Sequence, residues 1–133
     1  MKNIQYLESK DLLLLNNFIF HEQVEFNKFA KLGWTKENIK NHLKKENNYS
    51  IALINENKKY GFLLGEKILN TNNFDLEIHI MFVSKKMRRN NIGSSLLNFI
   101  ETNRKKTNIS KIYLEVSENN LEAIKFYEKN NFV

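Results

Sequence analysis

Residues Val83–Leu97 read Val-Ser-Lys-Lys-Met-Arg-Arg-Asn-Asn-Ile-Gly-Ser-Ser-Leu-Leu, and this stretch carries the strongest indication of the fold. An apolar strand ends at Val83, a basic polar loop follows, and an amphipathic helix is expected from about Ile92. The first turn of a helix leaves backbone N–H groups without intrahelical partners, and a phosphate placed there is held by these donors. The stretch therefore predicts either a phosphate-binding turn or an ordinary basic loop before a helix.

Single residues of this turn suit a bound diphosphate. Gly93 allows close approach of a ligand, and Asn91 tolerates a left-handed φ. Hydroxyl groups and positive charge come from the neighbouring residues Ser94, Ser95, Lys85, Lys86, Arg88 and Arg89. A Walker loop is excluded because no Gly-Lys-Ser/Thr follows, and a dinucleotide fingerprint is excluded because its three glycines are missing.

Outward from this turn, the hydrophobic periodicity predicts a single α/β (α+β) domain over residues 1–133. The expected order is β-α-α-β-β-β-α-β-α, and the hairpin before the central helix makes the sheet mixed. Strands are expected at Asn3–Leu7, Ser50–Ile54, Tyr60–Ile68, Phe74–Val83 and Ile109–Val116. Helices are expected after the cap Ser9, from the cap Thr35 to Lys45, from Ile92, and from Asn119 to about Lys129.

The strand Phe74–Val83 has a nearly unbroken apolar end, which is typical of a central strand covered on both faces. If it shares a sheet with Ile109–Val116, the helix between them forms a right-handed parallel crossover.

Composition excludes several classes of function. The chain has 133 residues with 21 Lys+Arg and 15 Asp+Glu, a net charge of +6, and no cysteine, which excludes disulfides, cysteine-ligated metals and a catalytic thiol. Only His21, His42 and His79 could supply imidazole, so no metal is expected. The basic pI of about 9.4 favours anionic partners, yet the general excess of Lys and Asn argues against a specific nucleic-acid function. No signal peptide or apolar span is visible, and a cytoplasmic protein without membrane contact is expected.

Three motifs in order resemble those of the GNAT N-acetyltransferase family: Arg88-x-x-Asn91-x-Gly93, Tyr113-Leu-Glu-Val116 and Asn120-x-x-Ala123-x-x-Phe126-Tyr127-Glu-Lys. The subgroup that they resemble most is the RimI type, which acetylates the N-terminal alanine of a ribosomal protein and shares the Trp34-Thr35 element. Asparagine replaces a family glycine at Asn91, and Asn130-Asn131 precedes Phe132 where the family commonly has a glycine before Phe.

The resemblance implies how acetyl-CoA is held. The backbone of Met81–Val83 would pair with the pantetheine arm, and Arg89–Ser94 would wrap the pyrophosphate. The implied cofactor-binding residues are Met81, Phe82, Val83, Arg88, Arg89, Asn90, Asn91, Ile92, Gly93, Ser94 and Asn120.

The resemblance also implies catalytic roles. Glu115 matches the general base of the RimI type, while Glu77 matches the base of histone-acetylating relatives. Tyr127 occupies the general-acid position, and a backbone N–H near Phe82 or Val83 would stabilise the oxyanion. Because the chain lacks cysteine, transfer should be direct within a ternary complex. His79, a lone strand histidine, fits a structural role more often than a substrate-side one.

Three functions stay open. The first is acetylation of a protein N-terminus, whose α-amine has a pKa near 8 and needs less help from a base than lysine, with a pKa of about 10.4. The second is acetylation of a small amine such as a polyamine, amino sugar or antibiotic, for which an acidic pocket is expected, whereas the acidic residues here are scattered in sequence. The third is an acetyl-CoA-binding module without turnover.

The end of the chain bears on assembly. The family's sheet usually has further strands after the helix that carries Tyr127, so we expect an unpaired edge at Lys111–Val116 or its neighbour. Either the sequence is truncated before these last strands or a neighbouring protomer completes the sheet, and a monomer or a homodimer is expected.

Overall fold

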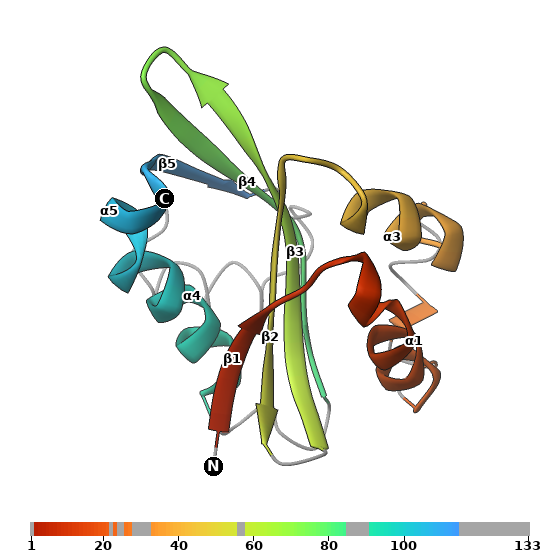
Figure 1. Cartoon of the computed structure of the whole chain (residues 1–133). Helices are drawn as coiled ribbons and strands as arrows, with labels where there is room; N and C mark the ends of the chain where they lie inside the picture. The colour runs from red at the N-terminus through yellow and green to blue at the C-terminus, as the bar shows by residue number, and fades with distance from the viewer. Residues whose placement is uncertain are drawn as a thin grey trace, which may run out of the picture.

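The computed structural model describes residues 2–21, 23, 26–27, 33–55, 58–84 and 91–114, and the structural statements below concern these residues. They contain one mixed sheet with the strand order β1-β2-β3-β4-β5 (Figure 1). The strands are β1 (Lys2–Tyr6), β2 (Asn48–Asn55), β3 (Lys58–Asn70), β4 (Asn73–Val83) and β5 (Ile109–Leu114). The first four strands pair antiparallel and β5 runs parallel to β4, which confirms the predicted hairpin and the parallel strand pair.

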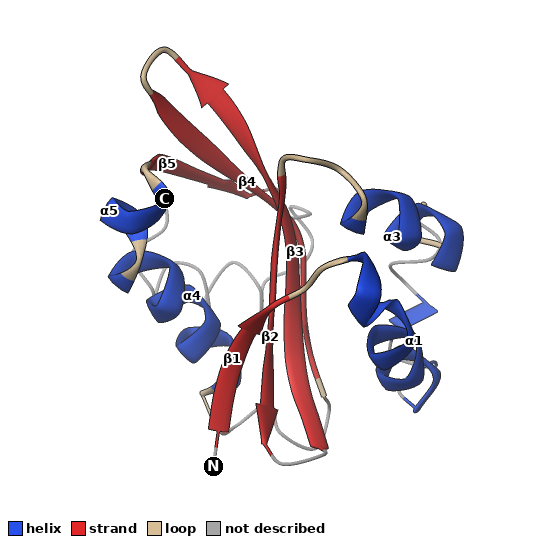
Figure 2. Ribbon diagram, in the orientation of Figure 1, coloured by secondary structure: helices blue, strands red, loops and turns tan. Residues whose placement is uncertain are grey.

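Helices cover both faces of this sheet (Figure 2). The 3₁₀ turn η1 (Ser9–Asp11), α1 (Leu12–His21) and α3 (Lys36–Leu43) lie on one side, and α4 (Ile92–Thr102) and α5 (Arg104–Thr107) lie on the other. The predicted α+β domain with a mixed, two-sided sheet is therefore confirmed. The expected helix at Asn119–Lys129 lies outside the described residues.

Each helical layer has its own hydrophobic core. On the α1/α3 side, the buried helix residues are Leu15, Phe18, Ile19, Ile39 and Leu43, packed with Ala52, Phe62, Leu64, Ile80 and Phe82 of the sheet. On the α4 side, they are Ile92, Leu96, Leu97 and Ile100, packed with Tyr49, Ile51, Leu53, Leu63, Leu76 and Ile78. Side chains alternate between the two cores along β2 and β3, as the period of a strand requires.

Strand β4 breaks this alternation at His79. Leu64 pairs with Ile80, but the next residue, Gly65, pairs with Ile78, so His79 is an extra residue that forms a β-bulge. Consequently Ile78 faces the α4 core while Ile80 faces the α1/α3 core, although both have even numbers. The bulge thus places His79 on the α3 side of the sheet, together with Glu77.

The start of the first helix differs from the prediction. The cap of η1 is Glu8 rather than Ser9, because the Glu8 N–H donates a hydrogen bond to Asp11 Oδ2 over 2.9 Å. The predicted cap Thr35 is confirmed, since its Oγ1 accepts from the Asn38 N–H at 3.3 Å. The four-residue helix α5 was not expected.

No helix among the described residues is long and apolar enough to cross a membrane. Within the described sheet β5 is the last strand in the order. Because residues 115–133 lie outside the described part of the chain, the unpaired edge expected at Lys111–Val116 stays a prediction.

Candidate functional site

The predicted phosphate-binding turn leads into α4 through a left-handed residue. Asn91, the N-cap of α4, has φ 59° and ψ 29°, a left-handed conformation that asparagine tolerates. The Ser95 N–H and the Ser95 hydroxyl both donate to the Asn91 carbonyl oxygen at 2.9 Å, so this hydroxyl is used inside the helix. The first-turn N–H groups of Ile92, Gly93 and Ser94 follow this left-handed residue and point out of the N-terminal end of α4.

A second glycine, which the sequence did not single out, lets this helix approach the sheet. A Cβ at Gly61 on β3 would lie 3.0 Å from the Phe82 carbonyl oxygen and 3.1 Å from Ile92 Cγ2. These contacts are tighter than ordinary van der Waals separation, so glycine at this position lets Ile92 pack closely against the sheet.

The structure describes some of the predicted cofactor-binding residues, and the others lie outside the described residues. Met81, Phe82 and Val83 form the end of β4, and Asn91 to Ser94 form the start of α4. Phe82 is 2% exposed within the α1/α3 core, so only its backbone is available to a ligand. The other predicted site residues lie outside the described residues: Arg88, Arg89, Asn90, Glu115, Asn120 and Tyr127.

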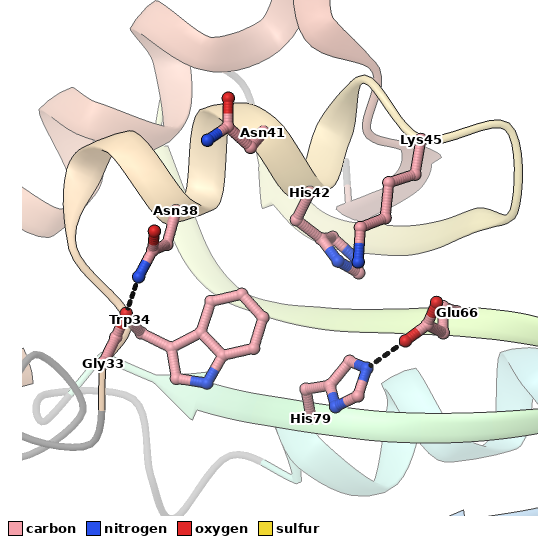
Figure 3. A pocket seen from close by; sticks show the side chains of 8 residues that line it. All are labelled: Gly33, Trp34, Asn38, Asn41, His42, Lys45, Glu66 and His79. Atoms are coloured by element: carbon pink, nitrogen blue, oxygen red, sulfur yellow. Dashed lines mark hydrogen bonds and ion pairs between the residues drawn. The ribbon is translucent and has the colours of Figure 1, made fainter.

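On the α3 side of the sheet there is a cavity of about 480 Å³ (Figure 3). Its walls come from the segment before α3, from α3 and the residues after it, and from strands β3 and β4. The lining residues are Gly33, Trp34, Asn38, Asn41, His42, Lys45, Glu66 and His79. Glu77, a predicted catalytic residue, is not among these lining residues, but its Oε1 lies 4.0 Å from Nδ1 of His79, which is.

Two carboxylates and one imidazole meet at the sheet side of the cavity. Glu66 and Glu77 are opposite partners in the β3–β4 pair, and the bulge puts His79 next to both. His79 Nε2 donates to Glu66 Oε1 at 2.9 Å, while His79 Nδ1 lies 4.0 Å from Glu77 Oε1. The other oxygen of Glu66 accepts from Asn47 Nδ2 at 2.7 Å. The hydrogen bond from His79, assisted by the one from Asn47, lowers the pKa of Glu66 below its usual value.

Aromatic rings hold this group in place. The Trp34 ring lies 5.6 Å from the His79 ring and 5.7 Å from the His42 ring, and the two imidazoles are 5.7 Å apart. His42 is 2% exposed, and its Nε2 donates to the Gly65 carbonyl oxygen at 2.8 Å. Burial lowers the pKa of His42 below its ordinary value, so the fold favours the neutral ring.

Glu66, Glu77 and His79 each offer one donor atom within 4.8 Å of the others. In the present arrangement the His79–Glu66 hydrogen bond uses one imidazole nitrogen and one carboxylate oxygen. The three groups are therefore arranged for holding protons or a cationic nitrogen.

Sequence analysis predicted Glu77 but did not single out Glu66. The sequence does contain an indication of Glu66. Counting outward along both strands from the predicted turn Asn70–Asn73 places Glu66 directly opposite Glu77. Like charges at opposite positions of a strand pair are destabilising, so such a pair indicates a site where positive charge is held.

Comparisons with known proteins agree with this geometry. The model of the acetyltransferase (GNAT) family matches residues 15–132. A search of curated proteins found no match.

Solved structures share the fold. The chain is similar to a possible acetyltransferase from Clostridium difficile 630 (22% identity, TM-score 0.78, 99% of this chain and 90% of that chain). It is also similar to an aminoglycoside acetyltransferase from an uncultured soil metagenomic sample, in complex with sisomicin (18% identity, TM-score 0.78, 98% of this chain and 88% of that chain). A third similar structure is the ribosomal-protein-alanine N-acetyltransferase from Brucella melitensis biovar Abortus 2308 (14% identity, TM-score 0.72, 97% of this chain and 90% of that chain). With the family match spanning most of the residues, the chain belongs to the GNAT acetyltransferase family and is an acyltransferase.

Proposed function

We propose that this protein transfers the acetyl group of acetyl-CoA directly to a primary amine, and that the amine is the N-terminal α-amine of a protein. The observation that carries the proposal is the family match over residues 15–132, whose first motif has its left-handed turn at Asn91. The preference for an N-terminus follows from the RimI-type motifs of the sequence.

The described residues fit the co-substrate. Asn91 and the buried Gly93 open α4 with main-chain donors, which suit a diphosphate. Arg88, Arg89, Asn90 and Asn120 would add charge and polar contacts, and the backbone of Met81–Val83 would line the pantetheine arm. When bound, acetyl-CoA supplies an acetyl group activated as a thioester.

The chain's own groups would handle the protons. Glu115 or Glu77 would take a proton from the acceptor amine, and Tyr127 would give one to the departing thiolate. Of these three residues the structure describes Glu77, whose side chain is 36% exposed and lies 4.0 Å from His79.

A second acceptor class has an observation in its favour. Glu66 and Glu77, separated in sequence, face each other, and Glu66 lines the same cavity as Trp34. Paired carboxylates and an indole bind ammonium groups well, by Coulomb attraction and cation–π contact. A small polycationic amine is therefore the alternative acceptor.

One assay separates the possibilities. Purified protein is incubated with acetyl-CoA and either ribosomal N-terminal peptides or free polyamines, and the products are identified by mass spectrometry. Peptide N-terminal acetylation supports the proposal, and polyamine acetylation alone supports the alternative. Acetyl-CoA binding in calorimetry without turnover on any amine would indicate a binding module instead.

Variants test the assigned roles. We expect Glu115→Gln and Tyr127→Phe each to reduce kcat, with Glu101→Gln on exposed α4 and Tyr6→Phe on β1 as matched controls. Full activity of both site variants would contradict the assignments.

A further inference from the structure

The imidazole of His79 lies between two glutamates that face each other across β3 and β4. Glu66 and Glu77 are opposite partners, and such like-charged pairs repel unless positive charge lies near. The bulge supplies this group, because it inserts His79 on the same face of the sheet. The two carboxylates attract an ammonium group placed beside the ring.

The geometry selects which ring nitrogen is free to act. Nε2–H donates to Glu66 Oε1 at 2.9 Å, and Glu66 is itself held by Asn47 at 2.7 Å. A neutral imidazole that donates from Nε2 carries its lone pair on Nδ1. Nδ1 lies 4.0 Å from Glu77 Oε1, which is too far for a direct hydrogen bond but allows a nitrogen donor to bridge the two.

We propose that His79 accepts the proton of the acceptor ammonium at Nδ1, that Glu77 holds this ammonium, and that Glu66 positions the ring. This inference rests on the proposed function, because it concerns the acceptor side of the same reaction. It departs from the proposed function in one respect: there Glu115 or Glu77 takes the proton, whereas here His79 takes it and Glu77 holds the ammonium.

The step balances as follows. The acceptor R–NH3⁺ gives one proton to His79 Nδ1 and becomes a neutral amine. Its lone pair forms the N–C bond to the acetyl carbonyl carbon while the C–S bond breaks. A second proton leaves the nitrogen and ends on the sulfur, giving the amide and the free thiol. His79, now an imidazolium between two carboxylates, returns its proton to solvent through the cavity.

The position of His79 along β4 suits this role. The bulge comes two residues before Met81–Val83, the segment proposed to line the pantetheine arm. His79 also lines the cavity of about 480 Å³, which an acceptor can enter. A His side chain at this point is therefore near both expected substrates.

Other titratable groups around the ring define the pH dependence to be measured. Among the described residues they are Glu66 from β3, Glu77 from β4 and His42 from α3, with Lys45 just after α3. His42 is already hydrogen-bonded to the Gly65 carbonyl oxygen, so its Nε2 is not available to the acceptor.

The test measures kcat and KM between pH 5 and 9 for the wild type, His79→Gln, Glu66→Gln and the control Glu101→Gln. Spermidine and an alanine-initiated ribosomal peptide serve as acceptors. We expect His79→Gln to lower kcat by about 10²- to 10⁴-fold and to lose the acidic limb of the profile. Glu66→Gln should lower kcat less than His79→Gln does, because it removes only the carboxylate that orients the ring.

Two further measurements keep the result unambiguous. Calorimetry should show unchanged acetyl-CoA affinity for every variant, which establishes that the fold is intact. Added imidazole should restore part of the activity of His79→Ala and leave that of Glu101→Gln unchanged.

If His79→Gln had a kcat within threefold of the wild-type value and the same pH profile, this inference alone would be overturned. Absence of transfer by the wild type would overturn the proposed function and this inference with it.

Discussion

The left-handed residue at the start of α4 provides the sharpest quantitative test. Asn91 has φ 59° and ψ 29°, close to the centre of the left-handed region. Among the described residues its side chain makes no capping hydrogen bond to α4, so substitution acts mainly through the backbone. Most L-residues pay roughly 1–2 kcal/mol in this conformation, whereas asparagine pays less and glycine pays almost nothing.

This gives an ordered series of variants. Asn91→Gly should change the free energy of unfolding by less than about 0.5 kcal/mol, Asn91→Ala should lower it by about 1 kcal/mol, and Asn91→Val by about 2 kcal/mol. In urea, with a slope of about 2 kcal/mol/M, these losses shift the midpoint by about 0.5 M for alanine and about 1 M for valine.

The same series should appear in co-substrate binding. If the left-handed turn directs the first-turn N–H groups at the diphosphate, Asn91→Gly keeps the acetyl-CoA Kd and Asn91→Val raises it by about tenfold, equivalent to about 1.4 kcal/mol. Isothermal titration calorimetry gives both values. If Asn91→Val unfolded at the same urea concentration as Asn91→Gly and bound acetyl-CoA equally well, the backbone reasoning would be refuted.

Other predictions concern stability. Gly65→Ala should lower the free energy of unfolding by about 2–3 kcal/mol in urea, because its Cβ would lie 2.9 Å from the Glu77 carbonyl oxygen and 3.0 Å from that of Tyr49. Gly61→Ala, whose new Cβ would meet one backbone oxygen at 3.0 Å and a movable side chain at 3.1 Å, should lose only about 1 kcal/mol, and equal losses would contradict this comparison. Burial lowers the pKa of His42, so the unfolded chain binds more protons than the folded chain below about pH 6.5. The free energy of unfolding should therefore keep its full value above that pH and decline below it, by at most about 1.4 kcal/mol per pH unit. His42→Gln should flatten this slope in urea titrations from pH 7 to 5, and an unchanged slope would show that another group is responsible. Thr35→Ala should cost about 1 kcal/mol by removing the cap of α3, as measured by thermal unfolding against a Lys36→Ala control.

The order of the secondary-structure elements could be predicted because each one carries a clear period. The stripe of Leu15, Phe18 and Ile19 gave α1, and the alternation along β2 and β3 gave the hairpin. The helix α5 could not be predicted, since Arg104–Thr107 forms a four-residue turn with no apolar stripe. The cap at Glu8 was missed because the 3₁₀ turn before α1 shifts the first capped residue by one position.

The candidate site was harder to predict, because it depends on register rather than on local pattern. From Ile78 to Val83 every position except His79 is apolar, so alternation could not reveal a bulge. Without the bulge, the side that His79 faces is unknown, and its contacts with Glu66 and Glu77 cannot be derived. Motif spacing, in contrast, depends only on the chain. It matched Asn91 to a family glycine, where asparagine tolerates a left-handed φ, and the structure has φ 59° at this residue.

The bulge also has a consequence for how this enzyme can change in length. Deleting residue 79 would remove the bulge and make Ile78 and Ile80 consecutive residues opposite Gly65 and Leu64. Leu76 and Ile78 would then stay in the α4 layer, and Ile80 and Phe82 would stay in the α1/α3 layer. Substitutions at His79 keep the count and spare both layers. Homologous chains should therefore accept one residue fewer between Leu76 and Phe82, and such a deletion should cost the imidazole contacts with Glu66 and Glu77 rather than the fold.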